Sequence, residues 1–320
     1  MRLIRNRPQW AKGALVPGPC AVAIGNFDGV HLGHRALIET SRQLAGPDWT
    51  VVVVTFEPLP QALFRPERAP ARLSTVYQKL DLLRSAGVDL TWLMRFDSQL
   101  AVLTAREFVE QVLVEKLDAS HVVVGEDFRF GCGQEGDVAM LTDFESELGF
   151  EVQTVPAVLC DKERVSSSGI RAKLAAGDFT SAADWLGRPF RMEGHVTRGA
   201  GLGRTLGYPT ANLRIRAEPS PLGGVLAAFS RVNGGPWLPA VTNLGRRPAV
   251  GGKEPLLEVH FFDLNEDLYG QRLEVQFVAK LRNELNFESL VDLVKQMKRD
   301  EKRARLCLAE AETPRNDPIG

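Results

Sequence analysis

The chain has 320 residues, of which 44% are hydrophobic and 25% charged, a composition that excludes a disordered chain. A single hydrophobic core stops growing below this length, so we expect two domains. The 39 Lys and Arg residues are balanced by 40 Asp and Glu residues, which excludes an overall positive field for holding a nucleic-acid backbone. Because no apolar run is long enough to span a membrane, we expect a soluble cytoplasmic protein with no nucleic-acid or membrane partner.

The first half of the chain alternates short apolar runs with segments of helical spacing. The runs lack polar alternation, which predicts strands buried on both faces of a parallel sheet, at 20–25, 50–56, 90–96, 121–125 and 150–159. The segments between them predict helices, several closed by glycine, at 34–45, 77–86, 106–117 and 138–148. Alternating strands and helices indicate a doubly wound α/β domain, which we place at residues 1–186.

After residue 186 the pattern changes to β-rich segments separated by glycine, proline and asparagine turns. These segments have no helix between them, which predicts a small antiparallel β-barrel, with strands at 191–196, 224–232, 256–264 and 272–281. Apolar residues from Phe287 to Leu308 mostly follow three- and four-residue steps, which predicts a helix packed across the barrel. We place this domain at residues 187–311 and expect a disordered tail at 312–320.

The segment GNFDGVHLGH, residues 25–34, begins where the first apolar strand ends and runs into a helix. This is the edge of an α/β sheet where ligands bind. His31 and His34 share one face at the start of the helix, beside free backbone N–H groups, and we expect them to bind anionic oxygens. The zinc-binding spacing H-E-x-x-H is not met, and two histidines satisfied within a turn would leave the nearby glycines unexplained.

This segment resembles the nucleotide-binding signature of the HxGH nucleotidyltransferases, specifically that of bacterial bifunctional riboflavin kinase/FAD synthetases. The segment RVSSSGIR, residues 164–171, is similar to the serine-rich loop with which this family holds ATP phosphates, although taken alone it is typical of a helix cap. The resemblance implies an ATP site for adenylylation made of Gly25, Asn26, Phe27, Asp28, Gly33, Ser167 and Arg171, with His31 and His34 as its catalytic residues.

The segment GEDFRFG, residues 125–131, is similar to the part of the family that lines the flavin and adenine pocket. Two further residues match positions near the flavin, but they could equally be core and turn residues. The implied flavin-binding residues are Phe56, Pro58, Asp127, Phe128 and Arg129. In the implied reaction an FMN phosphate oxygen attacks the α-phosphate of ATP. Because this nucleophile is already an anion, it needs positioning and charge stabilisation, not a general base.

The glycine-rich stretch at residues 198–212 fits neither of the common phosphate-binding motifs. It has Gly-Arg-Thr where a P-loop needs Gly-Lys-Ser/Thr, and it contains no G-x-G-x-x-G. A glycine-rich barrel loop is one interpretation. Together with the β-rich segments that follow, however, the stretch closely resembles the riboflavin kinase domain. The resemblance implies that Gly203, Thr210 and Asn212 bind ATP, and that the last two also bind Mg²⁺, which prefers oxygen ligands.

Phosphorylation of riboflavin removes a proton from a hydroxyl group, which calls for a carboxylate as general base. The resemblance assigns this role to Glu258, for which a solvent-facing strand carboxylate is the alternative interpretation. Arg282 matches the flavin-side loop of the kinase. The chain departs from the family at Leu226, where an aromatic residue is usual, and at Asp127, where asparagine is common. These departures put substrate affinity in doubt rather than the chemistry.

The resemblance covers roughly residues 15 to 308 and implies an enzyme that converts riboflavin to FMN and FMN to FAD. Its partners are then riboflavin, FMN, FAD and ATP, with Mg²⁺ as the metal, and no pattern indicates an oligomeric state. One alternative is an FMN adenylyltransferase whose barrel is only an accessory flavin-binding domain. Another is a flavin-storage protein, which would not need Glu258 beside Thr210 and Asn212.

Overall fold

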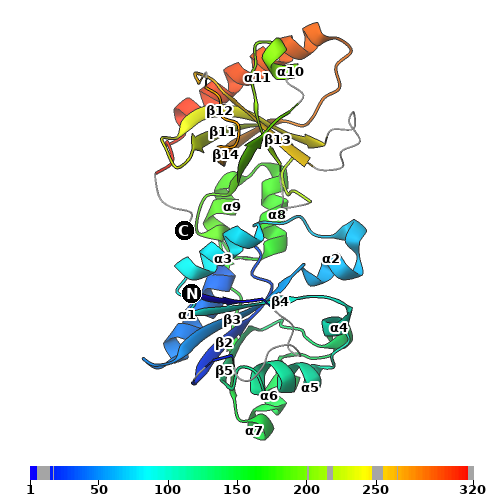
Figure 1. The fold of residues 1–320 in the computed structure, drawn as a ribbon, viewed down its shortest axis with the longest axis vertical. Coiled ribbons are helices and arrows are strands. Elements are labelled where there is room, and N and C mark those ends of the chain that lie inside the picture. Colours follow the sequence, from blue (N-terminus) through cyan, green and yellow to red (C-terminus); the bar gives the residue numbers. More distant parts are fainter. Residues whose placement is uncertain are drawn as a thin grey trace. The chain divides into compact units, whose positions relative to one another are not determined.

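A computed structural model of the chain describes residues 1–5, 15–16, 18–199, 202–214, 219–246, 255–264 and 266–315. These residues form two compact units. The first contains the chain up to residue 70 and residues 74–166, and the second contains residues 71–73 and the chain from residue 167. Each unit has its own sheet (Figure 1). Residues 316–320 of the expected tail lie outside the described residues, while the carbonyl of Arg315 accepts a hydrogen bond from Trp237 Nε1 at 3.2 Å.

A six-stranded parallel sheet forms the centre of the first unit. Its order is β1-β4-β3-β2-β5-β6, with bounds β1 Arg2–Ile4, β2 Cys20–Ile24, β3 Thr50–Glu57, β4 Leu90–Arg95, β5 Ala119–Gly125 and β6 Glu151–Val155. The chain winds outward in both directions from β2, which pairs with β3 on one side and β5 on the other. The carboxyl ends of these strands therefore mark the switch point at which such sheets bind ligands.

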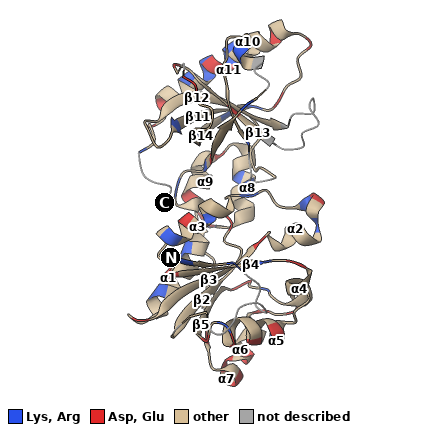
Figure 2. Ribbon diagram, in the orientation of Figure 1, with Lys and Arg blue, Asp and Glu red and all other residues tan. Residues whose placement is uncertain are grey.

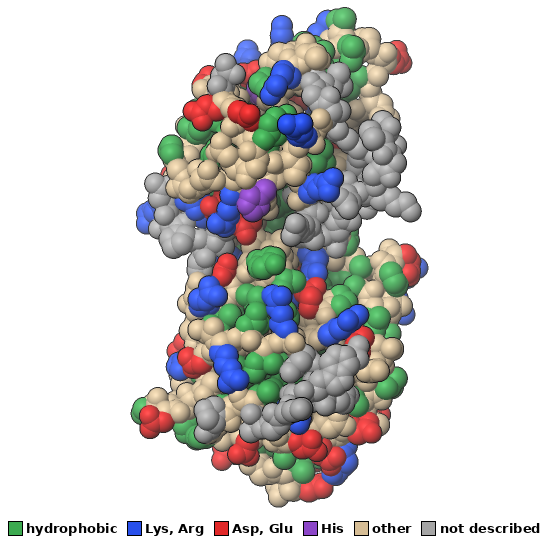
Figure 3. Space-filling model, viewed as in Figure 1, with side chains coloured by type: hydrophobic (Ala, Val, Ile, Leu, Met, Phe, Trp, Pro, Cys, Tyr) green, Lys and Arg blue, Asp and Glu red, His purple; other side chains and the backbone are tan. Residues whose placement is uncertain are grey.

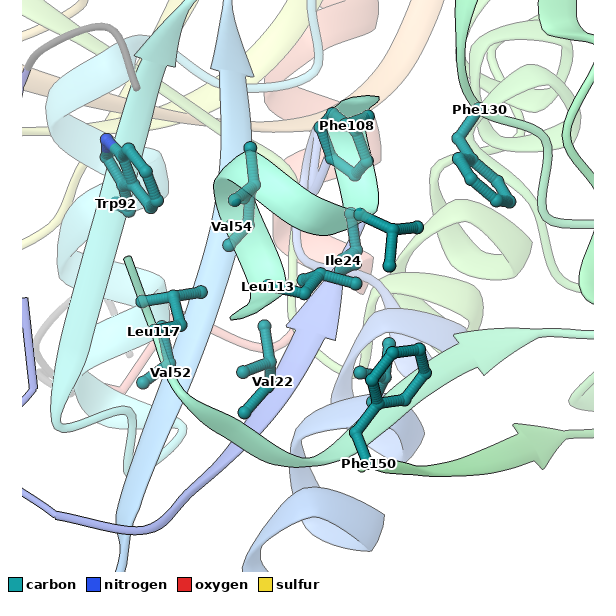
Figure 4. Packing of buried hydrophobic residues seen from close by; sticks show 14 of the residues in the cluster. Val22, Ile24, Val52, Val54, Trp92, Phe108, Leu113, Leu117, Phe130 and Phe150 are labelled. Atoms are coloured by element: carbon teal, nitrogen blue, oxygen red, sulfur yellow. The ribbon is translucent and has the colours of Figure 1, made fainter. Parts of the chain in front are cut away.

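Helices cover both faces of this sheet, which confirms the doubly wound α/β architecture. One face packs against α1 (Leu32–Leu44) and α3 (Val76–Ser85) through apolar residues of the helices, Leu37, Ile38, Leu82 and Leu83. The other face packs against α4 (Ser98–Ala101), α5 (Ala105–Phe108), η3 (Val109–Val114) and α6 (Val138–Asp143). Figure 4 shows this second core. Its labelled residues include Val22 and Ile24 of β2, Val52 and Val54 of β3, and their neighbours Trp92, Phe108 and Leu113.

Two predicted helices differ in detail from the observed ones. The helix expected at 106–117 begins as α5 and continues as the wider π-helical turns of η3. The helix expected at 138–148 is divided at the buried Phe144 into α6 and α7 (Glu145–Leu148), and Gly149 ends it with φ of 79°. The smaller elements of this unit are α2 (Pro60–Phe64), η2 (Pro66–Arg68), η4 (Cys132–Gln134), β7 (Leu159–Cys160) and β8 (Glu163–Arg164).

A closed antiparallel barrel forms the centre of the second unit, as the sequence predicts. Its order is β10-β13-β12-β11-β14-β9, with bounds β9 Arg191–Thr197, β10 Ala211–Arg214, β11 Gly224–Val232, β12 Leu238–Arg246, β13 Pro255–Phe261 and β14 Arg272–Arg282. Two helices, α8 (Ser167–Ala176) and α9 (Phe179–Leu186), precede the barrel, and a short α10 (Leu202–Thr205) follows β9. The ring of Phe179 lies 6.0 Å from that of Phe277 on β14.

The long C-terminal helix α11 (Leu290–Glu310) contacts β11, β12 and β14. Its predicted apolar stripe is only partly correct, because Leu290 and Val291 are 58% and 62% exposed. Asp300 is buried instead, and its Oδ2 lies 2.7 Å from Arg282 Nη2 of β14. Figure 2 shows both acidic and basic residues along this helix. The ion pair between Asp300 and Arg282 forms part of its attachment to the barrel, which apolar spacing could not predict.

Candidate adenylylation and kinase sites

The GNFDGVHLGH segment forms a strained turn between β2 and α1. Phe27, Gly29 and Val30 have φ of 48°, 80° and 42°, in the left-handed region that residues other than glycine rarely adopt. Phe27 and Val30 are nevertheless fully buried in the core, which holds the backbone in this conformation. Strain of this kind persists only where the surrounding structure imposes it, and it clusters at ligand sites.

The two histidines meet at the N-terminus of α1. His31 is the N-cap, and its Nδ1 accepts a hydrogen bond from the backbone N–H of His34 at 3.4 Å. The imidazole rings stack with centroids 3.7 Å apart and planes at 19°. Since Nδ1 of His31 accepts, the ring proton lies on Nε2, which can donate to an anionic oxygen. His31 is 6% exposed and His34 is partly exposed.

Gly33 lies close to the His31 ring and near the start of the serine-rich segment. A Cβ at this position would lie 3.2 Å from the His31 ring and 3.8 Å from the carbonyl oxygen of Val165. Ser167 and Arg171, the matched residues of that segment, belong to the second unit. There Ser167 is the first residue of α8, and the Arg171 side chain donates to the carbonyl of Ala71.

Polar side chains that the sequence analysis did not identify support the turn. Asp28 is buried, and its Oδ1 accepts a 3.2 Å hydrogen bond from the backbone N–H of Ser74. The N–H of Gly29 donates to Ser74 Oγ at 3.1 Å. The carbonyl of Asn26 accepts from Thr55 Oγ1 at 3.0 Å and from Lys79 Nζ at 2.9 Å, while its side chain is exposed. A sequence signal for this support was available in the capping box of Thr75 and Gln78, which fixes where α3 begins.

The predicted flavin residues lie at the carboxyl ends of β3 and β5, the strands that flank β2. Phe56 is partly buried and meets Phe96 edge to face at 5.8 Å, while Pro58 is exposed. The ring of Phe128 stacks on that of Phe130 at 5.3 Å. Two exposed ion pairs flank this segment, namely Asp127 with Arg164 at 2.6 Å and Arg129 with Asp137 at 3.3 Å. The structure thus brings the predicted flavin residues to the sheet edge that carries the histidines.

The predicted kinase residues meet on neighbouring strands of the barrel. Asn212 of β10 lies directly opposite Glu258 of β13, which places their Cα atoms about 4.5–5.5 Å apart. Glu258 is also opposite Asn243 of β12, and Asn212 is opposite Thr197 of β9. Residues directly opposite each other share a face of a sheet, so these side chains form one polar row across four strands. Asn243 and Thr197 were missed because their register is invisible in the sequence.

Asn212 has a buried oxygen that fits a metal ligand. The residue is 4% exposed, and its Nδ2 donates to the carbonyl of Thr210 at 3.2 Å. Its Oδ1 is buried and has no hydrogen-bond partner within the described residues, an arrangement that costs about 1–3 kcal/mol if nothing binds there. Amide and hydroxyl oxygens suit Mg²⁺, so Asn212 and Thr210 fit the metal that the resemblance implies. No group of three or more His, Cys, Asp or Glu able to hold a metal occurs in the described parts of the chain.

The loop that carries Thr210 is fixed at several points. His260 Nδ1 lies 2.8 Å from the carbonyl oxygen of Pro209, and the N–H of Tyr208 donates to the carbonyl of Gly203 at 2.8 Å. Burial raises the pKa of the Tyr208 hydroxyl, and a hydrogen bond with the carboxylate of Glu301 on α11 adds to this effect. These contacts hold the loop in place before any ligand arrives, which lowers the entropy lost on binding.

Gly199 makes a test of this geometry possible, because it lies against the Asn212 amide. A Cβ there would approach Nδ2, Cγ and Oδ1 of Asn212 to 2.5–2.7 Å, so Gly199→Ala must displace the amide. We expect FMN formation to fall roughly 10- to 100-fold, since small misplacements at a reacting centre cost this much. FAD formation from added FMN should be unchanged.

The control is Gly194→Ala on β9, where the nearest atom to a new Cβ is 3.6 Å away. Steady-state rates of both reactions decide the outcome. Equal FMN rates for the Gly199→Ala and Gly194→Ala proteins would contradict the assigned role of the Asn212 amide.

Comparison with known proteins identifies the family to which the chain belongs. Residues 15–169 match the FAD synthetase family, and residues 186–308 match the riboflavin kinase family. The bifunctional riboflavin kinase/FMN adenylyltransferase of Escherichia coli K12 is 42% identical over 287 residues, which cover 89% of this chain and 92% of that protein. The chain belongs to this bifunctional family. The enzyme of the same description from Haemophilus influenzae is 40% identical over 89% of this chain and 93% of that protein.

Membership of the family confirms the predicted bifunctional enzyme. Because both family matches occur in one chain, the alternative of an adenylyltransferase with an accessory barrel is not favoured. A crystal structure described as a macrolide-efflux protein from Streptococcus pneumoniae has the same fold, with a TM-score of 0.80 and 30% identity over 95% of this chain and 99% of that chain. In the present chain, the described helices include none that is long and apolar enough to cross a membrane.

Proposed function

We propose that residues 1–186 adenylylate FMN and residues 187–311 phosphorylate riboflavin, so that one chain carries out both ATP-dependent steps from riboflavin to FAD. The family matches at 15–169 and 186–308 support this division. The observation that carries the proposal is that each half has its own group of polar side chains suited to one of the two reactions. These groups are the stacked histidines at the end of β2 and the row of Asn212 and Glu258.

In the adenylylation step an FMN phosphate oxygen attacks the α-phosphorus of ATP, and the bond to pyrophosphate breaks. No proton has to leave the nucleophile, so the site needs only to align the reactants and stabilise charge. Nε2–H of His31 and the ring of His34 donate toward the phosphate, at a helix N-terminus whose dipole favours anions. By resemblance to the family, we assign Ser167 and Arg171 of α8 to ATP phosphates, since a guanidinium binds phosphate oxygens in pairs.

In the kinase step a hydroxyl oxygen of riboflavin attacks the γ-phosphorus of ATP, and ADP leaves. Glu258 takes the hydroxyl proton, because its carboxylate lies in the row that also contains Asn212. Thr210 and Asn212 would hold Mg²⁺, which would supply positive charge to the phosphates. Arg282 lies at the end of β14, where its Nη2 pairs with Asp300 at 2.7 Å and its guanidinium is 5.8 Å from the Phe287 ring centroid. We assign it to the flavin side of this site.

We infer that the protein acts in the cytoplasm, with riboflavin, FMN, FAD and ATP as its ligands and without nucleic-acid or membrane partners. The net charge of −1 supports this inference. On the face shown in Figure 3, blue and red side chains are interspersed among neutral ones and form no continuous basic stripe. A nucleic-acid backbone binds to just such a stripe.

The test is a time course of the intact protein with riboflavin, ATP and Mg²⁺, in which FMN, FAD, ADP and pyrophosphate are separated and measured. We expect FMN to appear first and FAD to follow after a lag. ADP should match the total flavin phosphorylated, and pyrophosphate should match the FAD. FMN that accumulates without FAD, or FAD that forms only from added FMN, would contradict the proposal.

A further inference from the structure

Lys79 is a buried lysine on α3 that lies beneath the turn between β2 and α1. We propose that it is a positioning residue for adenylylation, whose ammonium group holds the nucleotide-side turn and the flavin-side end of β3 in a fixed relation. The inference rests on the proposed function of that turn. It adds a residue that the motifs do not contain, since Lys79 lies 45 residues after the last histidine of the pair.

The contacts of the ammonium group join two segments. Lys79 is 0% exposed, and its Nζ donates to the carbonyl of Asn26 at 2.9 Å and to that of Phe56 at 3.5 Å. Glu57 Oε2 lies 3.8 Å from the same Nζ. Asn26 belongs to the GNFDGVHLGH turn, whereas Phe56 and Glu57 end β3. A lysine has three N–H donors, so one ammonium group can bind both carbonyls while it faces the Glu57 carboxylate.

Stability alone does not account for a charged group at this position. Taking an ammonium out of water is costly even when it is paired, and replacing a buried charge by an apolar side chain of similar size is often neutral or stabilising. The two carbonyls that Lys79 joins are both acceptors, however, and cannot bond to each other. A donor placed between them fixes their separation, and Lys79 adds this link to the bond that Thr55 Oγ1 makes to the Asn26 carbonyl.

The ammonium group of Lys79 also polarises a peptide group of the turn. The peptide between Asn26 and Phe27 is trans, since Glu57–Pro58 is the cis bond recorded among the described residues. In a trans peptide the N–H points away from the carbonyl, so the N–H of Phe27 is directed away from Lys79. A cation at the carbonyl polarises the peptide and strengthens this N–H as a donor. We expect this stronger donor to favour an anionic phosphate oxygen bound at the turn.

The two residues that lead into α3 hold the next part of the same turn and fix where the helix begins. Ser74 binds Asp28 and Gly29, and Thr75 caps the helix on which Lys79 lies one turn later. The helix and the segment that leads into it therefore fix the turn at residue 26 and again at residues 28 and 29. A rigid support of this kind is what a site needs when catalysis depends on alignment.

The experiment compares Lys79→Met with Leu83→Ala, a buried residue of the same helix that packs in the apolar core. For each variant and the wild type we would measure FAD formation from FMN and ATP, FMN formation from riboflavin and ATP, and the unfolding temperature. Lys79→Met should lower kcat/KM for FAD formation by roughly 100-fold, with KM raised for both FMN and ATP. Its kinase rate should equal that of the wild type. Leu83→Ala should lower the unfolding temperature and leave the adenylylation KM values unchanged.

Three outcomes count against the proposal. It is wrong if Lys79→Met forms FAD at the wild-type rate. It is also wrong if the variant loses both activities together with thermal stability, or if only one of the two KM values changes. Failure of the wild type to form FAD would instead contradict the proposed function of the turn, so the two failures are distinguishable.

Discussion

Glu258→Gln is expected to lower FMN formation by about 10²- to 10⁴-fold, the range that a general base contributes. Glutamine keeps the size of the side chain and its place opposite Asn212 and Asn243, but its amide cannot accept the hydroxyl proton. The effect should fall on kcat, because proton removal occurs in the transition state and not in the bound substrate. FAD formation from supplied FMN should continue at the wild-type rate.

The matched control removes a carboxylate nearby without touching the polar row. Asp263 follows β13 and has a mostly exposed side chain, 3.4 Å from Arg305. Asp263→Asn should leave both rates unchanged, since exposed ion pairs contribute little to stability. Rates of FMN formation at saturating riboflavin and ATP distinguish the variants. Undiminished turnover by Glu258→Gln would remove Glu258 from the role of base and favour its interpretation as an ordinary strand carboxylate.

The inner strands of the first unit could be predicted because burial on both faces leaves a signal in the sequence itself. The predicted burial of the run at 150–159 is wrong, since β6 lies at the sheet edge and has no fully buried residue. Runs such as CAVAI and TVVVVTF have no alternating polar residues for a solvent-facing side, and β2 and β3 coincide with these runs. The edge strand β1 was not predicted, since three residues are too few to show a pattern. Its three residues are exposed or only partly buried, so the apolar rule did not apply.

The candidate sites were predictable where neighbours in space are neighbours in sequence. His31 and His34 lie three residues apart, at the N-cap and in the first turn of one helix, so their proximity follows from helix geometry. The row of Asn212, Glu258 and Asn243 depends instead on the register of strands far apart in the chain, and only the family resemblance indicated two of its members. Lys79 was missed for another reason, because a lysine within a helix is usually exposed.

His31 offers the second large effect, and asparagine is the informative replacement. His31 caps α1 through its Nδ1, so alanine would remove both the cap and the donor at Nε2. Asparagine is among the best N-cap residues, whereas losing the cap altogether costs about 1 kcal/mol. His31→Asn should therefore keep the helix and the unfolding temperature but lower kcat for FAD formation by roughly 10²- to 10³-fold, the effect of removing one donor that stabilises transition-state charge.

The second histidine allows the mechanism to be separated from the fold. Because the two rings stack at 3.7 Å, we expect them to act as one unit on the phosphate. The double variant His31→Asn, His34→Asn should then be little slower than the worse single variant, since residues that act together are strongly non-additive. FMN formation by the same proteins serves as the internal control. If the losses in kcat multiply, each imidazole contributes independently, and joint action of the two rings on the phosphate is excluded.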